Sequence, residues 1–342
     1  MENREIIKNI AEHLVNQDIS KLPAGLFSGK MGICVSLFVS SKALNDSSIQ
    51  EKAESLLGEI IRECEEKMMA NDISLETGLS GIALGIAYLA ENKYVQADLD
   101  DVLKDFDDNI FRWIAFKSKE ELANSSNSLY GMLVYLLYRI QLYPNENHEA
   151  REIQQELIIL LINMLEQIND QTGYTQLSYE PRIFDITNYK LPVYLYIIAA
   201  VYQQYFYNYK LDRIIERLDF TVRSSFPALA AHRVLLLSGL RLFGSVFEEQ
   251  IDVLERSIDR ERMLREGFKD KSIGLNNGLS GLLALSMFDN NMQDFSGLIL
   301  KKIQSSSSLP VIEEERYLPN TLTGLAGVAL VLSIYELNSE TP

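Results

Sequence analysis

The chain has few of the residues that build disulfide frameworks, nucleic-acid surfaces and membrane spans. Only two of its 342 residues are cysteine, Cys34 and Cys64, so we expect no disulfide framework and a reducing, cytoplasmic compartment. Its 32 basic residues are outnumbered by 48 acidic ones, and the formal charge of −16 argues against nucleic acid as a partner. No apolar run reaches about 18 residues without a polar break, which predicts no membrane span. Residues 1–16 also lack the apolar core of a secretory signal.

Several motifs that carry chemistry are missing too. The sequence contains no P-loop and no dinucleotide-binding fingerprint, and no nucleophile elbow or Ser-His-Asp spacing can be recognised. Histidine is scarce, with three residues in the whole chain. These absences exclude the common nucleotide-dependent and serine-hydrolase classes.

A short motif of small residues is present instead, and it recurs along the chain ahead of apolar segments. Four clear copies lie at 29–32, 78–81, 278–281 and 324–327, and weaker copies lie at 128–131, 188–191 and 228–231. The last residues of the copies stand at positions 32, 81, 131, 191, 231, 281 and 327. A period near fifty, held along the whole chain, predicts a repeat architecture.

The segments between the motifs have a different character from those that follow them. Residues 2–16, 51–69, 149–166, 211–222 and 246–264 carry apolar side chains on one helical face and charges on the other. The segments after the motifs are apolar nearly all round. This alternation predicts an all-α fold in one domain over 1–342, an α/α toroid of seven inner and seven outer helices.

The motif glycines allow close backbone approach, so tight packing explains them well. A functional interpretation stands beside it, because all inner helices would begin on one face and gather unpaired N–H groups there. That face is the expected binding funnel. Its predicted lining is Asn276, Asn277, Phe226, Tyr130, Tyr189 and Arg233.

The glycine motifs and the apolar segments behind them resemble the lanthionine synthetase C-like family. The resemblance is carried by residues 25–32, 75–89, 275–285 and 322–332. It implies the toroid and, in the members that are cyclases, one zinc held by a cysteine before the fifth motif and a Cys-His pair before the sixth. The metal makes a substrate cysteine a thiolate, which adds to a dehydrated serine or threonine and closes a thioether ring.

This sequence departs from the family at each implied zinc ligand. Phe226-Pro227 precedes the fifth motif, and Asn276-Asn277 precedes the sixth. A further family histidine, before the fourth motif, falls near Thr187. Phenylalanine is no zinc ligand and carboxamides are weak ones, so we predict that the metal site, and with it any cofactor, is absent.

Three functions stay open at this point. The first is a zinc-less family member that binds or modifies a peptide natural-product precursor, with a peptide substrate or a modifying enzyme as partner. The second is a carbohydrate-active α/α-barrel enzyme, with Glu76 and Asp185 as paired acids, although an aspartate before a helix also suits capping. The third is a protein-interaction scaffold. His232 is a weak catalytic candidate, and the tyrosine-rich fourth repeat with its insertion at 169–186 is a candidate binding region.

Overall fold

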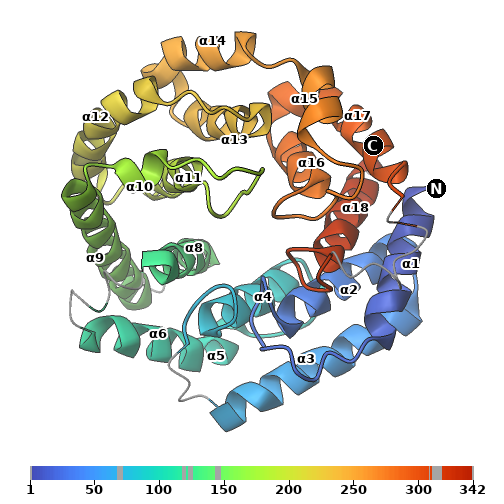
Figure 1. Ribbon diagram of the computed structural model, residues 1–342. Coiled ribbons are helices and arrows are strands. Elements are labelled where there is room, and N and C mark those ends of the chain that lie inside the picture. Colours follow the sequence, from blue (N-terminus) through green and yellow to red (C-terminus); the bar gives the residue numbers. More distant parts are fainter. Residues whose placement is uncertain are drawn as a thin grey trace. The chain divides into compact units, whose positions relative to one another are not determined.

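The computed structural model describes residues 2–67, 72–117, 121, 126–142, 148–307, 309 and 318–340. Within these ranges every regular element is a helix and no strand occurs (Figure 1). The predicted all-α class is therefore confirmed. None of the described helices has the length and apolarity that crossing a membrane requires.

Each of the seven motif copies opens a helix. In all but α8, the last motif residue lies within the first three residues of its helix. The first of these helices, α2, is enclosed nearly all round, with 13 buried residues. The motif helices are α2 (Lys30–Leu44), α4 (Leu79–Glu91), α8 (Ser126–Leu142), α11 (Lys190–Tyr202), α13 (Ala230–Arg241), α16 (Leu279–Phe288) and α18 (Leu325–Glu340).

The segments between them form amphipathic helices, as the charge pattern predicts. In α1, one face buries Ile6, Ile10 and Leu14, and the charged residues lie on the other. These helices are α1 (Asn3–Asn16), α3 (Ser47–Lys67), α6 (Lys104–Phe116), α9 (His148–Thr172), α12 (Asn208–Ser224) and α17 (Gln293–Gln304), and α5 (Leu99–Val102) is a short turn before α6. The predicted segment 51–69 ends outside the described residues.

Two segments differ from expectation. The single helix expected over 246–264 is broken into η1 (Gly244–Phe247), α14 (Glu248–Arg256) and α15 (Arg260–Gly267). Asp259 produces the break, since its side chain accepts from the Arg262 amide and caps α15. The insertion at 169–186 is partly helical, because α9 continues to Thr172 and α10 (Thr175–Ser178) follows after two residues of positive φ.

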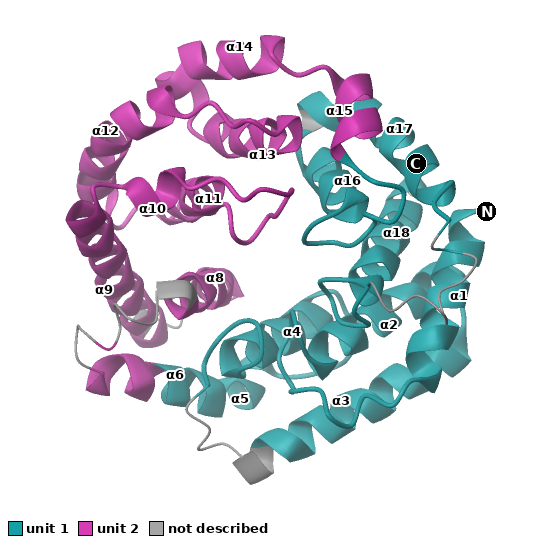
Figure 2. Ribbon diagram, viewed as in Figure 1, with its two compact units in different colours: residues 1–110, 268–342 teal, residues 111–267 magenta. Residues whose placement is uncertain are grey.

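The chain divides into two compact units (Figure 2). Unit 1 comprises residues 1–110 and 268–342, and unit 2 comprises residues 111–267. Unit 1 joins the two chain ends, because α18 packs on α1 and α2, and the Ser36 hydroxyl on α2 donates to the Ala326 carbonyl at 2.7 Å. The single-domain interpretation stays a prediction.

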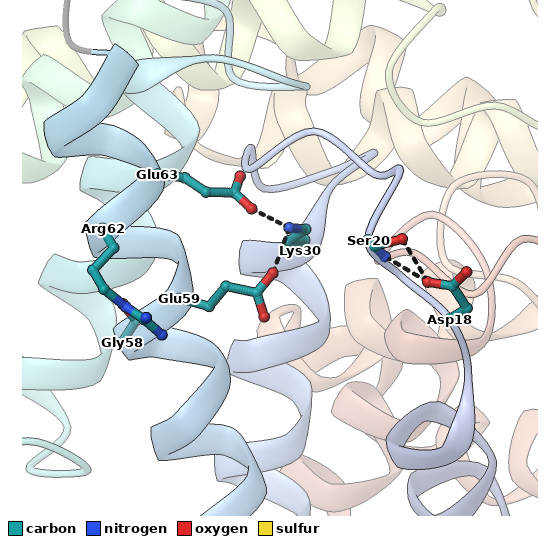
Figure 3. Close-up of polar contacts among 7 residues, drawn as sticks. All are labelled: Asp18, Ser20, Lys30, Gly58, Glu59, Arg62 and Glu63. Carbon is teal, nitrogen blue, oxygen red and sulfur yellow. Dashed lines mark hydrogen bonds and ion pairs between the residues drawn. The ribbon is translucent and has the colours of Figure 1, made fainter.

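The start of α2 is held to α3 by a buried cation. Lys30 is 1% exposed, and its ammonium pairs with Glu59 at 2.7 Å and with Glu63 (Figure 3). Burial alone would lower the pKa of Lys30, but the two carboxylates outweigh it and raise the pKa. The lysine is therefore charged, and it fixes the first motif helix against its amphipathic neighbour.

Candidate functional site

The loops that precede the motifs of unit 1 are joined by backbone hydrogen bonds. The Ser28 amide donates to the Glu76 carbonyl at 3.0 Å, and the Leu275 amide donates to the Thr323 carbonyl at 3.1 Å. The Thr323 amide in turn donates to the Phe27 carbonyl at 3.3 Å. The loops of the second, first, seventh and sixth copies thus lie side by side, in that order.

Each of these loops also folds back over the start of its own helix. The amide of the first helical residue donates to a carbonyl seven residues earlier, at 2.8 Å from Lys30 to Pro23 and 2.8 Å from Leu279 to Ser272. The same bond in α4 spans 3.1 Å. The first amides of these helices are therefore paired. The expectation of unpaired N–H groups at a funnel is wrong for these three helices, because the loop backbone already satisfies the donors.

Glycine makes this closure possible through close approach rather than through unusual backbone angles. A Cβ on Gly32, Gly81 or Gly327 would lie 2.0–2.1 Å from a loop carbonyl oxygen. The helix-capping Gly78 has a φ of −111°, which any residue can adopt. The packing interpretation of the motif is confirmed.

The helices of unit 2 that lack the glycines are closed by carboxylates instead. The Glu180 side chain accepts from the amides of Ala228 at 2.7 Å and Leu229 at 2.9 Å, just before α13. The Asp185 side chain accepts from the Thr187 and Asn188 amides, just before α11. Acidic groups suit these places because the N-terminal end of a helix carries partial positive charge. Asp185 therefore holds the loop that leads into α11, and the N-cap of that helix, Tyr189, makes no side-chain cap hydrogen bond.

His232 is fully buried and hydrogen-bonds to both Glu180 and Asp185. Its Nδ1 is 2.9 Å from a Glu180 carboxylate oxygen, and its Nε2 accepts from the Asp185 amide at 3.1 Å. An accepting Nε2 and a donating Nδ1 define the neutral imidazole. Burial lowers the pKa of His232, against the raising effect of both carboxylates. With both nitrogens engaged, His232 is a positioning residue and has no nitrogen left for a substrate.

The remaining predicted residues of unit 2 are Tyr189, Tyr130, Phe226 and Arg233, of which Tyr189 contacts His232. Tyr189 is buried with its ring centre 5.0 Å from that of His232, and the Lys190 ammonium lies 5.2 Å over the ring of Tyr130. Burial raises the pKa of both tyrosines. Phe226 is exposed, and the Arg233 guanidinium lies 5.0 Å from its ring centre. These side chains supply contact area and positive charge.

The other three predicted residues belong to unit 1. Asn276 is half-buried and its amide donates to the Thr323 carbonyl, while Asn277 and Glu76 are exposed. The predicted residues are thus divided between the two units. Glu180 is the functional residue that we did not place in the predicted site. A carboxylate 48 residues before the amide it caps carries no recognisable sequence signal.

The residues present do not fit the zinc of the family. Among the described residues, no three or more His, Cys, Asp or Glu side chains come together as a metal site. Phe226, Asn276 and Asn277 supply at best weak ligands. Cys34 is buried on α2 within 3.5 Å of the Ala53 carbonyl, and burial raises its pKa, so its thiol is not poised to bind metal.

Comparison with known proteins agrees with this architecture. A family model described as lanthionine synthetase C-like protein matches residues 20–189. Among solved structures, the chain is similar to nisin cyclase, with a TM-score of 0.62 and 18% sequence identity over 98% of this chain and 94% of that one. No curated protein matches. The likeness to nisin cyclase shows the fold and confirms the predicted α/α toroid class. The chain belongs to the lanthionine synthetase C-like family.

Proposed function

We propose that this protein binds or modifies a peptide natural-product precursor without the family's zinc chemistry, as an accessory protein or a divergent enzyme. The proposal rests on one observation: a chain with the fold of nisin cyclase has phenylalanine and asparagine at the positions where the family resemblance implies metal ligands in cyclases. The fold supports a peptide ligand. The side chains of Phe226, Asn276 and Asn277 are poor metal ligands, which argues against a metal-bound thiolate. We further propose a cytoplasmic setting and a modifying enzyme as partner.

The exposed side chains of unit 2 support the peptide part of the proposal. Phe226 presents an aromatic face beside a cation, Arg233, at the start of a motif helix. Aromatic side chains and arginine are enriched where proteins bind other chains. The position that would hold a zinc-binding cysteine in a cyclase is here a contact surface.

The test uses a linear peptide with one cysteine and one dehydroalanine. The proposal predicts that the protein binds the peptide, measured by calorimetry, and leaves its free thiol intact, measured by alkylation and mass spectrometry. Nisin cyclase is the matched control for ring closure. Loss of the thiol in the presence of this protein would contradict the zinc-less assignment, and absence of binding would contradict the peptide assignment.

The carbohydrate-active alternative is weakened by the geometry of Asp185. Its carboxylate accepts hydrogen bonds from Thr187 and from Asn188, so it is committed to the loop before α11. Glu76 is exposed and belongs to the other unit. Turnover of any member of a glycan panel that is lost in both Glu76→Gln and Asp185→Asn would revive this alternative. The scaffold alternative predicts a captured partner and no effect on the linear peptide.

A further inference from the structure

Three of the exposed large apolar side chains of unit 2 lie on two segments that hydrogen-bond to each other. Tyr179, Ile183 and Phe226 are 64%, 62% and 55% exposed, respectively. Large exposed apolar side chains gathered in one region mark interaction sites more often than isolated ones do. Together with Arg233 they are called here the Phe226 surface.

The two segments of the Phe226 surface are tied together. Glu180, next to Tyr179, accepts from the amides of Ala228 and Leu229, which follow Phe226 by two and three residues. The buried His232 bonds both the Glu180 carboxylate and the Asp185 amide. A surface fixed in this way loses little conformational freedom when a ligand binds.

The charge of the Phe226 surface is opposite to that of the chain as a whole. The Arg233 guanidinium donates to the Ser257 carbonyl at 2.8 Å and to the Ala228 carbonyl at 3.4 Å. Carbonyls hold a guanidinium without neutralising it. In the part of the chain that the structure describes, no carboxylate pairs with the half-buried Arg233, and its Nε is buried without a hydrogen-bond partner. Arg182, which is exposed on the loop that carries Tyr179 and Ile183, adds a second cation.

The carboxylates of this loop do not offset these cations at the surface. Glu180 and Asp185 direct their oxygens toward backbone amides of the segments just before α13 and α11. Hydrogen bonds from Leu229, Ala228 and His232 lower the pKa of Glu180 although burial alone would raise it. Each carboxylate therefore interacts with the backbone close to a helix N-terminus, where negative charge is favourable.

From this arrangement we propose that the Phe226 surface binds an acidic peptide segment in which a carboxylate stands next to an aromatic residue. The aromatic residue packs on Phe226, Tyr179 and Ile183, and the carboxylate pairs with Arg233. The formal charge of −16 disfavours such a segment on the protein as a whole, whereas Arg233 and Arg182 attract it at this surface. The inference rests on the proposed peptide-binding function and names the chemistry of its ligand.

Three synthetic hexapeptides test this by calorimetry at low ionic strength, where screening is weak. One alternates acidic residues with phenylalanines, the second replaces the acids by lysines, and the third replaces the phenylalanines by alanines. We expect the first peptide to bind about tenfold tighter than either of the others. Tighter binding of the lysine peptide, or no binding of the acidic aromatic one, would overturn the inference.

Substitutions on the Phe226 surface test whether the first hexapeptide binds there. Phe226→Ser and Arg233→Gln are each expected to weaken the first peptide about fivefold to tenfold. The matched controls are Phe220→Ser, on α12 with 81% exposure, and Arg265→Gln, on α15 with 71% exposure, and both should bind as the parent does. If Arg233→Gln does not fold, Tyr179→Ser on the exposed loop tests the same surface.

The outcome separates this inference from the function on which it rests. If the cysteine-containing linear peptide binds but its affinity is unchanged in Phe226→Ser and Tyr179→Ser, the Phe226 surface is excluded and the peptide function stands. If the acidic hexapeptide binds the parent protein and loses affinity in both variants, the surface is assigned. Equal losses in the Phe220→Ser control would contradict it.

Discussion

Mild acid should loosen unit 2 through His232. The folded protein holds this imidazole neutral, with Nε2 accepting from the Asp185 amide and Nδ1 donating to Glu180. Protonation of Nε2 removes this acceptor, so that an imidazole N–H faces the backbone N–H of Asp185. Because the folded-state pKa lies below the usual value of about 6.5, the unfolded chain takes up the proton first. The stability that His232 contributes is therefore complete above pH of about 6.5 and is lost as the pH falls below it.

Replacing His232 by phenylalanine removes both hydrogen bonds while keeping a ring in the buried site. A part-buried amide left without an acceptor costs about 1–3 kcal/mol, and the lost bond to a carboxylate contributes about 1.5–3 kcal/mol. Glu180 keeps its two amide donors and is partly exposed, which favours the lower part of each range. We expect His232→Phe to destabilise unit 2 by about 2–4 kcal/mol at pH 7.5.

Urea unfolding followed by tryptophan fluorescence measures both effects. The single tryptophan, Trp113, lies in unit 2 and therefore reports on the unit that contains His232. Between pH 7.5 and 5.5 the parent should lose more unfolding free energy than His232→Phe does, and the control His13→Gln should behave as the parent. Equal losses in the parent and His232→Phe, or a parent that gains stability as the pH falls, would refute the reasoning.

Three pairs of variants test the packing of unit 1, and each pair is compared by the free energy of unfolding. Gly81→Ala places a Cβ 2.1 Å from a backbone carbonyl and should cost about 3 kcal/mol or more, whereas Gly58→Ala, with nothing within 4 Å, should stabilise α3 by about 0.5–1 kcal/mol. Ser80→Ala, at a buried hydroxyl without a partner among the described residues, should be neutral or stabilising, whereas Ser36→Ala should cost about 1 kcal/mol. Lys30→Met should cost less than replacing both of its carboxylate partners by glutamine, since only the latter leaves a buried charge unpaired. The reverse order in any pair would contradict the packing described.

Sequence periodicity predicted the seven motif helices because their physical cause is local. Apolar residues repeat along each helix, and the glycines meet carbonyls only five or six residues earlier, at Leu26, Leu75 and Leu322. The break at 257–259 was missed, because the apolar pattern continues through it and only Asp259 marks the new helix start.

The site of unit 2 was harder to predict because its contacts are distant in sequence. His232 and Asp185 were recognised as candidates, but their roles were set by Glu180, 52 residues before His232. Residue type alone suggested catalysis, and only the geometry shows that both imidazole nitrogens are occupied. The expected free amides in α2, α4 and α16 were wrong for a similar reason, since a loop that folds back on itself leaves no mark in composition.

The zinc content of the purified protein tests the central claim most directly. Elemental analysis by mass spectrometry after dialysis against metal-free buffer, with nisin cyclase as the control, gives the number of metal ions per chain. Since Phe226, Asn276 and Asn277 offer no thiolate or imidazole, we predict far less than one zinc per chain and no gain on adding zinc before dialysis. One tightly retained zinc per chain would contradict the account.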